Sequence, residues 1–263
     1  MKRRSTSRRR KSRSSATRND SLRVLAIDIG GTGLKAAIVD KDGKLVSERK
    51  RIPTPKQRSP AKVLVALDAL VSGLPRWNRI SIGFPGYVKR GRIVTAPNLG
   101  TRKWAGYPLE TALSKRFRAP AKLLNDADMQ GLAVISGKGL EFVVTLGTGF
   151  GSALFRDGEV MPHLEIAHIP VRSGMSYDDY IGDKTRKKIG NAHWNRRVAR
   201  VIGIMRTLIN FDRLLIGGGN ARRLTRLPKD ALVVSNDAGI EGGAALWHRL
   251  SGRSLAARRS GTD

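Results

Sequence analysis

The feature that most constrains this chain is a glycine-rich turn between two apolar runs near its beginning. Residues 25–40 read LAIDIGGTGLKAAIVD, so residues with strand propensity flank Gly30, Gly31, Thr32 and Gly33 on both sides. Glycines in such a turn allow a backbone to approach a ligand closely, and the ligand is often a phosphate. The turn therefore predicts a phosphate-binding device, whose type depends on the residues that follow.

Those following residues exclude two of three phosphate-binding devices. A P-loop needs G-x-x-x-x-G-K-[ST], but Gly30 has no glycine five positions later and Lys35 is not followed by Ser or Thr. A dinucleotide turn, G-x-G-x-x-G, leads into a helix, whereas residues 36–43 continue as a strand into a hairpin turn. The remaining device is a β-hairpin whose turn offers N–H groups to phosphate. Asp28 precedes this turn and would repel phosphate unless it holds Mg²⁺, directly or through water.

Strands and helices alternate along the rest of the chain, which indicates the α/β class. Further strands are expected at residues 45–52, 79–86, 121–125, 141–147, 151–156 and 211–216, and helices at 61–74, 109–117, 126–135, 187–209 and 238–250. A second strand–glycine turn–strand unit around residues 146–151 repeats the first, so we expect two lobes with a ligand between them. The lobes are expected at residues 21–122, completed by the helix at 238–250, and at residues 123–237, with a polar tail at 251–263.

The charge of the chain predicts a polyanionic partner. Fifty Lys and Arg residues against 21 Asp and Glu residues give a net charge of +29. A surplus of this size attracts nucleic acid, polyphosphate or an anionic membrane, although general solubility explains it equally well. Residues 1–20 contain nine basic residues and one acid, with no apolar core, so we expect a disordered basic tail and no secretory signal.

Two absences narrow the class of protein further. The chain has no cysteine, which excludes disulfides, thiolate catalysis and cysteine-bound zinc. No apolar run approaches the ~18 residues of a membrane helix. We therefore expect a soluble cytoplasmic protein with no membrane partner and no zinc.

Three glycine-rich motifs resemble, in this order, the phosphate motifs of the actin/Hsp70/sugar-kinase superfamily. They are DIGGT at residues 28–32, LGTGFG at 146–151 and LIGGGN at 215–220. Two further segments resemble the ROK family of sugar kinases and repressors, namely LNDADMQGLA at 124–133 and EIAH at 165–168, where Ala167 replaces the usual glycine. Several stretches are most similar to the polyphosphate glucokinases of that family. The resemblance implies a two-lobed actin-like ATPase (ribonuclease H-like) fold with a central cleft.

The resemblance also implies an activity. It implies a kinase that transfers a phosphoryl group from polyphosphate, ATP or both to the 6-hydroxyl of glucose, with Mg²⁺ as cofactor. Such a reaction needs a proton acceptor at the hydroxyl and donors around the phosphates. Asp126 is expected to be the catalytic base; as the first residue of a predicted helix after a strand, it would otherwise serve only as a helix cap.

The resemblance assigns the remaining site residues by motif. The implied sugar contacts are Asn98, Asn125, Glu165, His168 and Asp178, with Asp179 as a rival for the last place. The implied phosphate contacts are Gly30, Gly31, Thr32, Gly147, Thr148, Gly149, Gly217, Gly218 and Gly219. Asp28 is the implied Mg²⁺ anchor. Lys35 either neutralises phosphate charge or lies on the outer face of its strand, and His163, His193 and His248 are read as structural.

Two other functions compete with the kinase. A ROK-type DNA-binding regulator needs a helix-turn-helix domain before the first phosphate motif, where only about 20 residues stand, so we do not expect it. A non-catalytic protein that binds nucleic acid or another polyanion on the same scaffold would account for the basic tail. The intact Asp28, Asn125, Asp126 and Glu165 argue against a scaffold that has lost its catalytic residues. The donor, the hexose and a homodimeric state stay open at this point.

Overall fold

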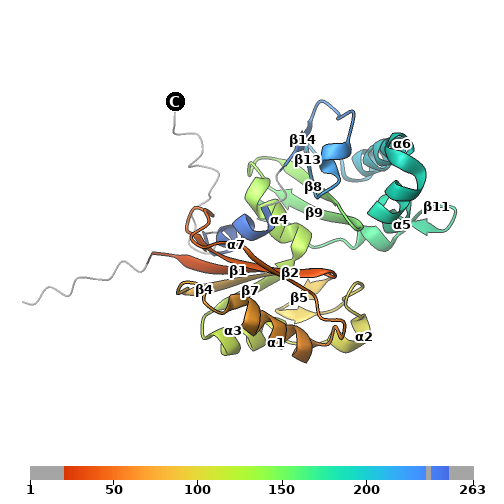
Figure 1. Ribbon diagram of the computed structural model, residues 1–263. Coiled ribbons are helices and arrows are strands. Elements are labelled where there is room, and N and C mark those ends of the chain that lie inside the picture. The colour runs from red at the N-terminus through yellow and green to blue at the C-terminus, as the bar shows by residue number, and fades with distance from the viewer. Residues whose placement is uncertain (1–20, 235–237, 249–263) are drawn as a thin grey trace, which may run out of the picture.

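Two β-sheets, one in each lobe, organise the chain in the computed structural model, which describes residues 21–234 and 238–248 (Figure 1). The first sheet has the strand order β3-β2-β1-β4-β7. Its strands are β1 (Arg23–Ile29), β2 (Gly33–Asp40), β3 (Lys50–Pro53), β4 (Arg79–Phe84) and β7 (Ala121–Asn125). Strands β1, β2 and β3 pair antiparallel, whereas β1, β4 and β7 run parallel. The carboxyl ends of β1, β4 and β7 therefore meet at one edge, where ligands bind in open α/β sheets.

Helices cover both faces of the first sheet. Helices α1 (Pro60–Val71) and α3 (Leu109–Phe117) lie on the face that points down in Figure 1, where Leu25, Ile27 and Ile29 of β1 join the core. The alternate residues of β1 and β2 face α7 (Ala238–His248) and include the small Ala26 and Ala37. These small side chains suit the close approach of a helix, because a Cβ on Gly243 would lie 2.9 Å from that of Ala26.

The second sheet has the order β10-β9-β8-β13-β14 and supports the other lobe. Its strands are β8 (Leu140–Leu146), β9 (Phe150–Arg156), β10 (Glu159–Val160), β13 (Arg213–Gly217) and β14 (Ala231–Val233). Strands β8 and β9 form an antiparallel hairpin, and β13 runs parallel to both β8 and β14. Each sheet thus contains a glycine-turn hairpin beside parallel strands, as the repeated sequence unit predicts.

Helices α5 (Tyr177–Ile181) and α6 (Asp183–Ile209) pack on the second sheet. Trp194, Val198, Val201 and Met205 of α6 face a core cluster that includes Phe142. Gly190, with φ of 77° and ψ of 160°, interrupts the helical geometry of α6 near its beginning.

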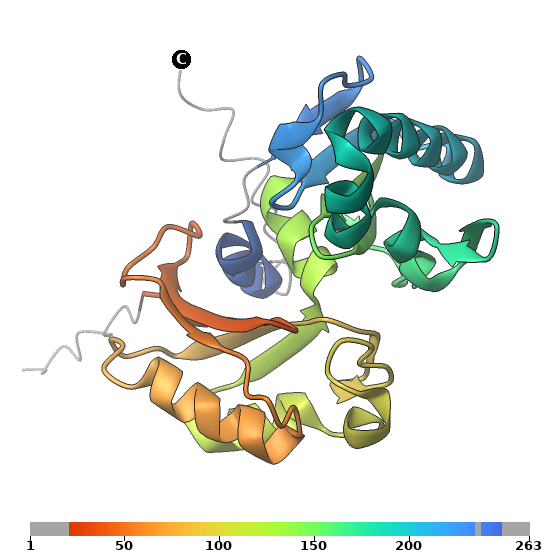
Figure 2. The same cartoon turned by 45° about the vertical axis from the view of Figure 1, so that its right-hand side comes forward.

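Helix α4 (Asp126–Val134) lies between the two sheets and packs closely against α7, as both cartoon views show (Figure 2). The last described helix therefore joins the first lobe to α4. The shorter elements are β5 (Val88–Lys89), β6 (Arg92–Ile93), α2 (Thr101–Trp104), β11 (Pro170–Arg172), β12 (Met175–Ser176) and the 3-10 turns Ile166–His168 and Ala221–Arg223.

Some sequence-based boundaries were wrong. The strand expected at residues 45–52 begins only at Lys50, because Leu45 forms an isolated bridge with Val39 and is 46% exposed. Helix α6 begins four residues earlier than expected, because the N–H of Asp183 is held by the carbonyl groups of Gly147 and Thr148. The expected tails at residues 1–20 and 251–263 and the end of the last helix lie outside the described residues. No helix within the described ranges is long and apolar enough to cross a membrane.

Candidate active site in the cleft between the lobes

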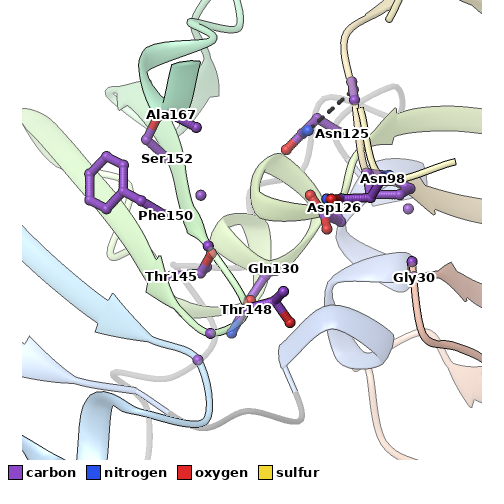
Figure 3. Close-up of a pocket in the computed structure, with 18 of the residues that line it drawn as sticks. Gly30, Asn98, Asn125, Asp126, Gln130, Thr145, Thr148, Phe150, Ser152 and Ala167 are labelled. Carbon is purple, nitrogen blue, oxygen red and sulfur yellow. Dashed lines mark hydrogen bonds between the residues drawn. The ribbon is translucent and has the colours of Figure 1, made fainter. Parts of the chain in front are cut away.

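A cavity of about 440 Å³ lies between the two lobes, and the two glycine turns line it from opposite sides (Figure 3). Gly30 and Asn98 stand on one side with Asp126, whereas Thr145, Thr148 and Phe150 stand on the other. Every site residue expected from the sequence lines this cavity, with the exception of Gly217. The sequence motifs, which are far apart in the chain, therefore meet at one place.

Asp126 is free to face the cavity because its neighbour caps the helix. Asn125, at the end of β7, is the N-cap of α4, and its Oδ1 accepts from the N–H groups of Ala127 at 2.8 Å and Asp128 at 3.4 Å. The Nδ2 of Asn125 donates to the carbonyl of Gly86 at 3.2 Å, which fixes the amide orientation. The helix cap that Asp126 might have supplied is therefore supplied by Asn125, although Asp126 also accepts from Ala127 at 2.9 Å.

The environment of Asp126 favours its protonated form. Burial, followed by the negative charge of Asp28, raises the pKa of Asp126 to about 7, while the Ala127 N–H and His163 oppose the shift. Asp126 is half-buried as a residue and lines the cavity, where a substrate can reach it. A carboxyl group that titrates near neutral pH in a cleft is well matched to general base catalysis.

Asp28 and Lys35 form an ion pair at the first glycine turn. They are opposite one another in the β1–β2 register, and the Nζ of Lys35 donates to Oδ2 of Asp28 at 2.8 Å. Lys35 also lines the cavity, so it lies on the ligand side of its strand. Of the two positions considered for Lys35 from the sequence, the structure shows the one inside the site.

The second glycine turn is bound to α5 through Asp178. Oδ1 of Asp178 accepts from the N–H of Phe150 at 2.6 Å, and burial raises the pKa of this carboxyl group. A Cβ on Gly149 would lie 2.4 Å from the same oxygen, so a larger residue at this position would displace the Asp178 carboxylate. Asp179, the rival, is exposed, does not line the cavity and forms a capping box with Ser176, which lowers its pKa.

Glu165 and His168 come from the 3-10 turn after β9 and β10. Nε2 of His168 lies 3.5 Å from Oε2 of Glu165, and Oγ1 of Thr95 donates to Oε1 of Glu165 at 3.2 Å. Asn98 is exposed at the cavity rim, where a Cβ on Gly31 would lie 2.9 Å from its own Cβ. The polar groups proposed for the sugar thus line the cavity from both of its sides.

The third glycine motif reaches the cavity with only two of its three glycines. Gly218 and Gly219 line the cavity, and Gly218 has a φ of 88° and leaves no room for a Cβ, which would lie 2.3 Å from the carbonyl oxygen of Leu146. Gly217 is buried as the last residue of β13 and pairs with Thr145. It lies behind the cavity wall because strand pairing, and not the turn, fixes its position.

The sequence did not indicate several residues that line the cavity. His163, for which the sequence predicts a structural role, lines the cavity together with Gln130, Thr145, Ser152 and Gly239. The side chain of His163 is only 9% exposed and contacts two carboxylates. Because a single histidine between Pro162 and Leu164 has no distinguishing pattern, no sequence signal separated it from a structural histidine.

The acidic side chains allow a test of whether magnesium suits the site. Within residues 21–234 and 238–248, no three His, Cys, Asp or Glu side chains form a cluster that could hold a metal ion. Mg²⁺ in phosphoryl-transfer sites needs only one or two protein carboxylates, because substrate phosphates and waters complete its coordination. Asp28 supplies one carboxylate that faces the cavity, so the residues present fit a magnesium ion that arrives with its phosphate.

The two sheets, each with a glycine-turn hairpin, and the cleft between the lobes define the two-lobed actin-like ATPase fold. The ROK family profile matches residues 24–172, and the chain belongs to this family. The chain is 30% identical over 236 residues to the polyphosphate glucokinase of Mycobacterium tuberculosis strain CDC 1551, an alignment that covers 83% of this chain and 88% of that protein.

Two solved structures show the same fold. The inorganic polyphosphate/ATP-glucomannokinase of Arthrobacter sp. strain KM has a TM-score of 0.78 and 30% identity, covering 88% of this chain and 99% of its own. A ROK family glucokinase from Streptomyces griseus, solved with glucose and AMPPNP, has a TM-score of 0.70 and 20% identity, covering 85% and 98% respectively.

Proposed function

We propose that this chain is a glucokinase that transfers a phosphoryl group from polyphosphate, ATP or both to the 6-hydroxyl of glucose. The observation that carries the proposal is the position of Asp126, at the start of α4 between two opposed glycine turns, with a pKa raised to about 7 by burial. The names of the relatives support this reaction, and the cavity supplies polar groups for both a sugar and a phosphate chain.

The sugar is expected to contact Asn98, Asn125, Glu165, His168 and Asp178, which line the cavity from both lobes. Carboxylates and an imidazole can accept from and donate to vicinal hydroxyls, and Asn125 is already oriented by its bond to Gly86. Asp126 is then expected to accept the proton of the sugar 6-hydroxyl while the hydroxyl oxygen attacks the terminal phosphorus of the donor. The bond between that phosphorus and the bridging oxygen of the donor breaks, and the shortened donor leaves with the bond's electrons.

The donor is expected to bind between the glycine turns. Gly30, Gly31, Thr32, Gly147, Thr148 and Gly149 would supply N–H and hydroxyl donors, Gly218 and Gly219 would line the far end, and Lys35 would neutralise charge. Asp28 would hold Mg²⁺, which supplies positive charge against the transferred phosphate oxygens when bound. A cytoplasmic location suits these donors.

The proposal is tested by a coupled assay of glucose phosphorylation with ATP and polyphosphate in parallel. Asp126→Asn is expected to reduce kcat with either donor by at least about 100-fold, the usual range for a lost general base. Asp179→Asn is the matched control, because this neighbouring acid does not line the cavity, and it is expected to retain turnover. Absence of glucose phosphorylation with both donors would refute the proposed activity, and unchanged turnover in Asp126→Asn would refute the assignment of Asp126 as the base.

The same assay distinguishes between the donors. Each phosphate neutralised by Lys or Arg adds salt-dependent affinity, so polyphosphate-dependent turnover should decrease steeply with salt and increase with chain length. A flat response to both would exclude polyphosphate as the physiological donor. Removal of residues 1–20 then tests whether the basic tail contributes to this affinity or only to nonspecific binding of nucleic acid.

A further inference from the structure

His163 lies between two carboxylates that belong to different parts of the site. Its Nδ1 lies 3.2 Å from Oδ2 of Asp128 in the first turn of α4, and its Nε2 lies 3.7 Å from Oε1 of Glu165. The side chains of His163 and Asp128 are 9% and 5% exposed, whereas Glu165 is 30% exposed toward the cavity. Because both ring nitrogens face an anion, the doubly protonated, positively charged imidazole is favoured.

The first lobe contacts the same group of residues. The ring of Tyr87, from the loop after β4, stacks on that of His163 with centroids 6.1 Å apart and planes inclined by 17°. Oγ1 of Thr95 donates to Glu165 and accepts from the N–H of Tyr87 at 2.9 Å. His163 and Glu165 of the second lobe are therefore in contact with two residues of the first lobe, at the cavity where the sugar is expected.

We propose that His163 is a positioning residue, which bridges Asp128 and Glu165 and so holds the Glu165 carboxylate in the orientation that binds the sugar. The inference rests on the proposed function, because that function supplies glucose as the sugar that Glu165 would bind. Nε2 of His163 lies near Oε1 of Glu165, the oxygen to which Thr95 also donates, whereas Nε2 of His168 lies near Oε2. A histidine that only stabilised α4 would need its bond to Asp128 alone.

The charges around His163 make its bridging role measurable without any ligand. Burial acts to lower the pKa of His163, but the hydrogen bond to Asp128 and the charges of Asp128, Glu165 and Asp126 raise it above its usual value overall. Glu165→Gln is expected to lower the pKa of His163, as followed by NMR of the imidazole, with Glu159→Gln on β10 as the matched control. An unchanged pKa in Glu165→Gln would show that the two residues are not coupled.

A double-mutant cycle on glucose binding tests the positioning role itself. In His163→Asn the amide can keep the bond to Asp128 but cannot reach Glu165, so the glucose Kd should increase roughly tenfold, the effect of one charge-assisted contact. In the Glu165→Gln background the same substitution should change the glucose Kd less than twofold. The Kd for tripolyphosphate, measured by calorimetry, should stay unchanged in both single variants.

The outcomes separate this inference from the proposed function. Equal effects of His163→Asn in both backgrounds, or a parallel loss of tripolyphosphate binding, would make His163 a structural residue and overturn the inference. If the wild-type protein binds no glucose, the proposed function fails and the sugar-positioning role fails with it. The NMR experiment then still decides whether His163 and Glu165 are paired.

Discussion

Lys35 donates to Asp28 at 2.8 Å from the directly opposite position on the neighbouring strand. The carboxylate at the first glycine turn therefore already has a cation beside it before any donor arrives. A magnesium ion at Asp28 has to compete with this ammonium group, or has to displace it toward the phosphates.

This competition predicts that Lys35→Met lowers the Mg²⁺ concentration for half-maximal turnover by up to about fivefold, the size of a partly exposed ion pair. The same variant should raise the KM for the phosphoryl donor, because a cation is lost from the cavity. Magnesium titrations of glucose phosphorylation measure both effects. Lys115→Met, an exposed change on α3, is the control, and an increased magnesium requirement in Lys35→Met would contradict this interpretation of the pair.

The pKa of Asp126 predicts how activity depends on pH. Because burial and the charge of Asp28 raise that pKa to about 7, and because the base acts when deprotonated, kcat/KM should increase with pH through about 7. Below that value it should decrease about tenfold per pH unit. Rates at low substrate concentration between pH 5.5 and 8.5 test this, and a level profile would exclude Asp126 as the group that titrates.

The same shift predicts a pH-dependent effect on stability. The folded state binds the Asp126 proton more tightly than the unfolded state does, so the bound proton increases the free energy of unfolding. This contribution to stability is complete below pH about 4 and is lost as pH increases through about 7. Asp126→Asn should therefore stabilise the free protein increasingly from pH 4 to pH 8. The gain should stay below about 4 kcal/mol, because one pKa unit corresponds to about 1.4 kcal/mol and the group is partly solvated. Chemical denaturation at both pH values measures it, and a gain that is equal at pH 4 and pH 8 would contradict the shift.

The two glycines of the second turn should respond differently to an added methyl group. A Cβ on Gly149 would lie 2.4 Å from Oδ1 of Asp178, whereas a Cβ on Gly147 meets no protein atom within 4 Å. Gly149→Ala should therefore displace Asp178 and raise the KM for glucose roughly tenfold, as for the loss of a charged hydrogen bond. Gly147→Ala, its matched control, should leave that KM unchanged, and equal values in both variants would remove Asp178 from the sugar site.

The contact between α7 and α4 should also be sensitive to an added methyl group. A Cβ on Gly242 would lie 2.0 Å from the carbonyl oxygen of Met129, so Gly242→Ala should cost at least about 1–3 kcal/mol through overpacking. This corresponds to about 2–4 °C in Tm for each kcal/mol in a domain of this size. Gly203→Ala, on an open side of α6, is the control and should melt at or above the wild-type Tm. An unaltered Tm in Gly242→Ala would contradict the close packing.

Local sequence patterns predict those elements whose bounds are set by their own residues. The strand at residues 121–125 and the helix at residues 109–117 agree with the structure at both ends, because an apolar run and an amphipathic period define them. The two glycine hairpins were predicted by the strand residues on either side of the glycines. The beginning of α6 at Asp183 was not predictable, since its N–H is bound by carbonyl groups of a turn more than thirty residues away.

The site shows the same limit. The sequence motifs alone place Asp28, Asn125, Asp126 and Glu165 in one predicted site. The preference for Asp178 over Asp179 in the cavity depends on α5, a short helix without a periodic pattern, so spacing alone left it open. His163 depends on Tyr87 and Asp128, which only the tertiary fold brings to it.

Helix α7 covers a sheet whose strands were synthesised far earlier. Until Ala238 and the residues after it leave the ribosome, Val24, Ala26, Ala37 and Val39 have no partner on the face that Ile240 and Ala244 later cover. A nascent first lobe therefore exposes a small apolar surface for almost the whole of translation, and surfaces of this kind are aggregation-prone. Premature termination before α7 should thus give a product that chaperones retain and proteases remove, even though every predicted catalytic residue has already been made.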